Sequence, residues 1–81
     1  MGFHINTGHE DPNFTVLVAR GVQGRDLGYI TICWRSRRFA LGVPITPLSR
    51  DRNPEYAGRH WRDRLWNDAY RELEDAVRSS Q

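Results

Sequence analysis

The feature that most constrains the fold is the alternation of apolar and polar residues on either side of Ser36-Arg37. A period of two is typical of a strand with one buried face, because successive strand side chains point to opposite sides. If Ser36-Arg37 is a two-residue loop, Trp34 faces Phe39, and directly opposed residues share a face of the sheet. The buried face of this hairpin is then predicted to consist of Ile30, Ile32, Trp34, Phe39, Leu41 and Val43.

Two further strands are predicted before the hairpin. "FTVLVAR" at 14–20 is rich in β-branched and aromatic residues, and "GFHIN" at 2–6 has two apolar side chains at a spacing of two. Between them, "TGHEDPN" at 7–13 has the glycine, proline, asparagine and aspartate content of a loop. Pro44 and Pro47 are expected to end the last strand, because proline cannot donate to a sheet ladder.

A C-terminal helix is predicted from "NPE" at 53–55 to about Val77. Asn53 suits the N-cap, Pro54 the first helical position, and Glu55 the positive end of the helix dipole. At 3.6 residues per turn, one half of the helix contains Trp61, Leu65, Trp66, Ala69, Leu73, Ala76 and Val77, with Tyr70 at its border. Arg62 projects into the same half and interrupts the apolar stripe.

The predicted fold class is α+β, a three- or four-stranded antiparallel β-meander packed against one C-terminal α-helix. We expect residues 1–13 to form an N-terminal segment, a short strand plus loop, and residues 14–81 a single β-β-β-α domain. The chain has 81 residues, enough for one modest core. Its one cysteine, Cys33, excludes an intramolecular disulfide and favours a reducing compartment. With no apparent signal peptide or membrane span, we expect a cytoplasmic protein.

Positive charge is concentrated in the middle of the chain. All 12 basic residues are arginine, and the net charge is +2. Residues 14–52 hold seven arginines against two aspartates, a net charge of +5, whereas residues 53–81 hold five arginines against six acidic residues, a net charge of −1. Most helix arginines have an acidic residue four positions away and can pair within the helix. The sheet is therefore a better candidate than the helix for an anionic partner.

The face of the hairpin turned away from the helix is the predicted binding surface. Small side chains at its centre would make a flat platform bordered by arginines, which form forked contacts with phosphates and guanine edges. The predicted nucleic-acid- or partner-binding residues are Arg20, Arg25, Tyr29, Thr31, Arg35, Arg37, Arg38, Arg50 and Arg52. Two alternatives stay open: a surface for a protein partner, and the ordinary polar face of a half-exposed sheet.

No motif for catalysis, metal binding or a cofactor is recognisable. His4, His9, Glu10 and Asp11 match no closed zinc pattern, and Cys33 has no histidine in an obvious supporting position. The chain also lacks a phosphate-binding glycine loop and the G-x-S-x-G motif. We therefore expect a protein that is not an enzyme and that uses no cofactor and no metal.

The spacing of arginines and glycines in residues 20–43 resembles that of the plant APETALA2-type DNA-binding domain, whose three-stranded sheet is shared by the arm-binding domain of integrases. The matching positions are Arg20-Gly21-Val22, Arg25, Gly28, Arg35 and Leu41-Gly42. The resemblance implies that Arg20, Arg25 and Arg35 contact a DNA groove or phosphates. It also implies that Gly21 and Gly28 serve backbone geometry.

These observations favour a small non-enzymatic module of phage or mobile-element origin that binds nucleic acid, duplex DNA in particular, in the bacterial cytoplasm. The alternative is a small phage inhibitor, similar to anti-CRISPR proteins, that binds a host protein through the same sheet surface. A third hypothesis is a virion or assembly component whose exposed strand pairs with another chain. The sequence leaves homodimer formation open.

Overall fold

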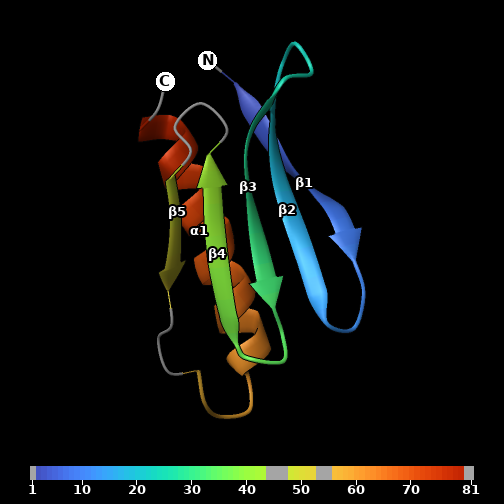
Figure 1. The fold of residues 1–81 in the computed structure, drawn as a ribbon, viewed down its shortest axis with the longest axis vertical. Helices are drawn as coiled ribbons and strands as arrows, with labels where there is room; N and C mark the ends of the chain where they lie inside the picture. The colour runs from blue at the N-terminus through green and yellow to red at the C-terminus, as the bar shows by residue number, and fades with distance from the viewer. Residues whose placement is uncertain (1, 44–47, 53–55, 80–81) are drawn as a thin grey trace.

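The computed structural model describes the backbone of residues 2–43, 48–52 and 56–79, and the side chains of residues 2–41 and 56–79. Five strands form one antiparallel sheet in the order β1-β2-β3-β4-β5, and a single helix, α1, lies across one face (Figure 1). The elements are β1 Phe3–Glu10, β2 Phe14–Gly21, β3 Asp26–Cys33, β4 Arg38–Val43, β5 Leu48–Arg52 and α1 Trp61–Ser79. The predicted class, an α+β fold with an antiparallel meander against one C-terminal helix, is confirmed. The sheet has one strand more than the three or four expected, because β5 was not predicted.

The N-terminal segment is a full edge strand, and the loop predicted at 7–13 is reduced to residues 11–13. β1 pairs with β2 from Phe3 opposite Gly21 to Glu10 opposite Thr15, with a bulge between Thr7 and His9. The second half of β1 is exposed, so no hydrophobic alternation marks it as a strand. A Cβ at position 8 would lie 2.9 Å from Cγ2 of Val18, so a larger residue at this bulge would have to displace that side chain.

The predicted register of the β3–β4 hairpin is wrong by two residues. Cys33 pairs with Arg38 and Ile32 with Phe39, so the loop comprises residues 34–37. The backbone N–H of Trp34 donates to the carbonyl of Asn13 at 2.9 Å, next to the β2–β3 pair Phe14–Cys33 and away from β4. An even shift leaves strand side chains on their original face, and Ile30, Ile32, Phe39 and Leu41 are buried as predicted. The side chain of Val43 lies outside the described residues.

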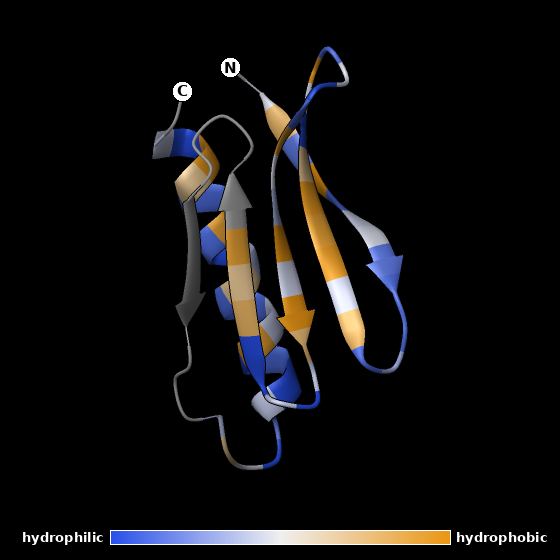
Figure 2. Ribbon diagram, viewed as in Figure 1, coloured by the Kyte–Doolittle hydropathy of each residue, from blue (hydrophilic) through white to orange (hydrophobic). Residues whose placement is uncertain are grey.

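The core lies between the helix and the inner face of β2, β3 and β4, whose apolar residues are visible in Figure 2. Four helix residues at a spacing of four are fully buried: Leu65, Ala69, Leu73 and Val77. They pack against Leu17, Ala19, Ile30, Ile32, Phe39 and Leu41 from the sheet. The buried stripe is narrower than the predicted half of the helix. Trp66, predicted to be core, is 36 % exposed and stacks on Tyr70, with ring centroids 5.1 Å apart.

The helix begins at Trp61, later than predicted. The proposed cap at 53–55 lies outside the described residues, and 56–60 are not helical. Gly58 has a φ of 92°, outside the right-handed helical region. Tyr56 is buried, and its hydroxyl donates to Oδ2 of Asp68 at 2.7 Å. Burial of Tyr56 thus fixes a non-helical connection against the first turns of α1.

Candidate nucleic-acid interface

The side of the sheet away from α1 presents three transverse rows of side chains. Cross-strand pairing aligns Phe14 with Cys33 and Arg38 in one row, and Val16 with Thr31 and Ala40 in the next. Val18 and Tyr29 form the third row. We call this set of eight residues the outer face: Phe14, Val16, Val18, Tyr29, Thr31, Cys33, Arg38 and Ala40.

Two aromatic rings stand exposed on the outer face. Tyr29 on β3 is 46 % exposed and Phe14 on β2 is 44 % exposed, while Val16 and Val18 are half-buried. Tyr29 is among the predicted binding residues, whereas the outward residues of β2 are not, because an outward face was predicted only for the hairpin. The alternation in "FTVLVAR", with Leu17 and Ala19 buried, is the signal that would have found them.

Exposed arginines lie near both ends of the outer face. Arg20, at the end of β2, and Arg25, in the following turn, lie at one end. Arg35, in the β3–β4 loop, and Arg38, at the start of β4, lie at the other. Nε of Arg20 is 3.0 Å from Oδ1 of Asp26, an exposed ion pair. Such pairs contribute only about 0–1 kcal/mol, so a phosphate can compete for Arg20.

Arg37, also predicted to bind a partner, is instead held against the body of the protein. Its guanidinium carbon lies 4.1 Å from the ring centroid of Trp61, and Nη1 donates to the carbonyl of Tyr56 at 2.8 Å. Arg37 also has a φ of 57°, which helps to close the loop. These contacts tie the β3–β4 loop to the start of α1.

Arg62, which interrupts the apolar stripe of the helix, belongs to the same cluster. Its guanidinium carbon lies 4.8 Å from the ring of Trp34 and 5.3 Å from the ring of Trp61. The two tryptophans meet edge to face at 6.2 Å. A cation over an aromatic ring is attracted by the ring quadrupole, which accounts for an arginine beside the core. We call Trp34, Arg37, Trp61 and Arg62 the tryptophan–arginine cluster.

The two remaining predicted arginines, Arg50 and Arg52, lie on β5. Arg50 pairs with Leu41 and Arg52 with Phe39, two residues of the helix side, whereas Asp51 pairs with Ala40 of the outer face. The side chains of Arg50 and Arg52 lie outside the described residues. Their assignment to the binding surface stays a prediction.

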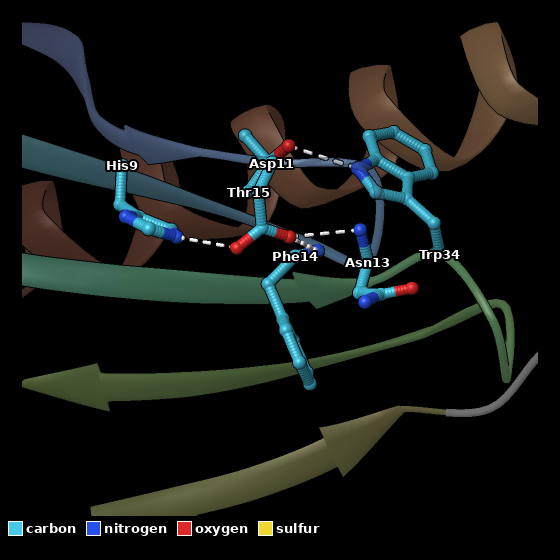
Figure 3. Close-up of polar contacts among 6 residues, drawn as sticks. All are labelled: His9, Asp11, Asn13, Phe14, Thr15 and Trp34. Atoms are coloured by element: carbon cyan, nitrogen blue, oxygen red, sulfur yellow. Dashed lines mark hydrogen bonds and ion pairs between the residues drawn. The ribbon is translucent and has the colours of Figure 1, made fainter.

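The turn between β1 and β2 is organised by Asp11 (Figure 3). Oδ1 of Asp11 accepts the backbone N–H groups of Asn13 and Phe14 at 2.8 Å, and Oδ2 lies 2.7 Å from Nε2 of His9. These hydrogen bonds, that of His9 first, lower the pKa of Asp11 below its ordinary value. Asp11 thereby fixes the start of β2, where Phe14 stands. Among the described residues, no group of three or more His, Cys, Asp or Glu side chains is placed to hold a metal.

Cys33 lies half-buried in a shallow hollow of about 230 Å³ on the outer face. Hydrogen bonds from Ser36, side chain first and then backbone, lower the pKa of the thiol. The hollow is also lined by Thr31, Arg38, Phe39 and Ala40. These lining residues include no general base that could activate the thiol as a nucleophile. We therefore treat the hollow as part of the outer face and not as a catalytic site.

No protein-family model matches the chain, and neither a curated protein nor a solved structure was found to be similar to it. Within the described residues, α1 is the only helix, and it is too polar to span a membrane.

Proposed function

We propose that this protein is a small, non-enzymatic module that binds nucleic acid through the outer face of its sheet. One observation supports the proposal most: an apolar sheet surface with exposed Tyr29 and Phe14 has arginines at both of its ends. Aromatic rings can stack on bases while arginines contact the phosphates of the same strand. A phage or mobile-element protein working in the bacterial cytoplasm would fit this proposal.

The charge distribution favours an anionic partner on this side of the molecule. Arg20, Arg25, Arg35 and Arg38 are all exposed near the outer face, and Arg20 forms an exposed ion pair with Asp26. On the helix, acidic and basic residues alternate, as in the pair Glu74–Arg78 at 3.4 Å. Binding through the exposed arginines would release counterions, so affinity should fall steeply as salt rises.

Fluorescence anisotropy tests the proposal. The wild-type protein is titrated against random-sequence oligonucleotides, single-stranded and duplex, from low to physiological salt. The double variant Arg35→Ala/Arg38→Ala should weaken binding and lower the salt slope by up to about two. The double variant Arg59→Ala/Arg71→Ala, which removes two exposed arginines from the helix side of the molecule, is the matched control. An unchanged slope in the first variant would contradict this assignment of the site.

A second candidate is a protein partner for the same face, as in a small phage inhibitor that binds a host protein. The apolar centre of the outer face favours it, because aromatic residues and arginine dominate binding energy at protein interfaces. The oligonucleotide titration separates the two candidates. Absence of binding at low salt to any oligonucleotide would leave the protein partner as the better proposal, to be pursued by affinity capture with outer-face variants as controls.

A further inference from the structure

The β3–β4 hairpin is not a free ribbon that can enter a groove of duplex DNA. The major groove is about 12 Å wide and admits a helix or a two-stranded ribbon. Here β3 and β4 are interior strands, flanked by β2 and β5 (Figure 1). Five strands at about 4.8 Å spacing make a sheet about 19 Å across, which is too wide for that groove.

The basic loop of the hairpin is also attached to the rest of the fold. Trp34 donates from its indole N–H to Oγ1 of buried Thr15 at 2.8 Å (Figure 3). Arg37 stacks on Trp61 and donates to the carbonyl of Tyr56. The loop therefore cannot be presented as a flexible probe of base edges, and Nη1 of Arg37 already donates within the protein.

The exposed rings suit bases that are not already stacked in a duplex. Phe14 pairs with Cys33, and Tyr29 pairs with Val18, so the two rings stand on neighbouring strands, four residues apart along the sheet. At about 3.3 Å per residue the separation along the strands is about 13 Å. Both rings occupy the same side, and half-buried Val16 and Thr31 lie in the row between them.

We infer that the outer face binds single-stranded nucleic acid in preference to duplex, with Tyr29 and Phe14 as two base-stacking positions. This inference rests on the proposed function. The strand would run along β2 and β3, and its phosphates would reach Arg20 and Arg25 at one end and Arg35 and Arg38 at the other. Such stacking tolerates any sequence, because every base has a π-face.

The test compares a labelled oligothymidylate with a labelled duplex of equal length, at one low salt concentration. The single strand should bind at least tenfold more tightly. Tyr29→Ala and Phe14→Ala should each weaken single-strand binding by roughly 5- to 150-fold, the loss of one stacked base, with little effect on duplex binding. Tyr29→Phe should retain most of the affinity. Trp66→Ala, which removes an exposed ring on the helix, is the matched control and should bind as the wild type does.

Photo-crosslinking provides a second readout that does not depend on the variants. A 4-thiothymidine oligonucleotide should crosslink to peptides containing Tyr29 or Phe14. Crosslinks confined to α1 would overturn the inference. Tighter duplex binding that is insensitive to Tyr29→Ala would also overturn it, although the proposed function would stand. Absence of binding to both probes would overturn the inference and the proposed function together.

Discussion

The two faces of the same three strands differ in what covers them. On β2 and β3, Leu17, Ile30 and Ile32 are fully buried beneath α1, while Phe14 and Tyr29, facing the other way, are nearly half exposed. Successive residues of one strand therefore serve different purposes. Substitutions on the inner face should change the free energy of unfolding, and substitutions on the outer face should change binding.

Ile30→Ala should have the largest effect on folding. Ile30 is fully buried between the sheet and the helix, and truncating such a residue leaves a cavity. The free energy of unfolding, measured by urea denaturation, should fall by about 2–5 kcal/mol. Tyr29→Ala, one residue earlier on the same strand, is the matched control and should change it by less than about 1 kcal/mol. Equal losses for the two variants would contradict the division between the faces.

Trp34→Phe tests the hydrogen bond that attaches the β3–β4 loop to the core. Removing the indole N–H leaves the hydroxyl of Thr15, itself 1 % exposed, without that partner. An unsatisfied buried group costs about 1–3 kcal/mol, whereas replacing both partners by apolar groups costs much less. The double variant Trp34→Phe/Thr15→Val should therefore be less destabilised than the sum of the single variants in urea denaturation. Simple additivity would show that this bond contributes little.

Arg37→Ala and Arg35→Ala compare two arginines of one loop. Arg37→Ala should lower the free energy of unfolding by about 1–2 kcal/mol, because it removes a cation–π contact with Trp61 and a hydrogen bond to the Tyr56 carbonyl. Arg35 is exposed, and its loss should leave thermal stability nearly unchanged but weaken oligonucleotide binding. Arg37→Gly, which accepts the positive φ without strain, should lose less stability than Arg37→Ala. A larger loss of stability in Arg35→Ala than in Arg37→Ala would contradict this assignment of the two arginines.

The smallest effect is expected at the β1–β2 turn, in acid. The pKa of Asp11 is lowered in the folded protein, so its ionised form stabilises the native state above its ordinary pKa of 3.8. That contribution is lost as pH falls below 3.8 through the folded-state pKa. Urea denaturation of wild type and Asp11→Asn from pH 7 to pH 2 should show a stability difference that shrinks below about pH 3.8. A difference that is constant with pH would mean that the charge of Asp11 is irrelevant to folding.

Much of the fold could be predicted from the sequence because one periodicity dictates it. The alternation around Ile30, Ile32, Phe39 and Leu41 identifies the inner face, and an even register error leaves that face intact. Edge strand β1 could not be recognised beyond its first residues, because backbone pairing with β2 maintains it without burial.

The candidate site was less predictable. Sequence position does not distinguish an arginine that stacks on a tryptophan 24 residues away, as Arg37 does, from one that faces solvent, as Arg35 does. The start of α1 at Trp61 was likewise not predictable, because residues 56–60 are not helical and include Tyr56, which is buried through a tertiary contact. Phe14 was missed for a different reason, because the outward face of β2 was never assigned.

Methyl and aromatic NMR spectra recorded during titration with an oligothymidylate would show which face of the sheet binds the oligonucleotide. The methyl signals of Val16 and Val18 and the ring signals of Tyr29 and Phe14 should shift, while the methyl signals of Leu65 and Leu73, on the buried side of α1, should not. Shifts centred on Trp66 and Tyr70 of α1, or no shifts at low salt, would contradict the assignment of the outer face as a nucleic-acid interface.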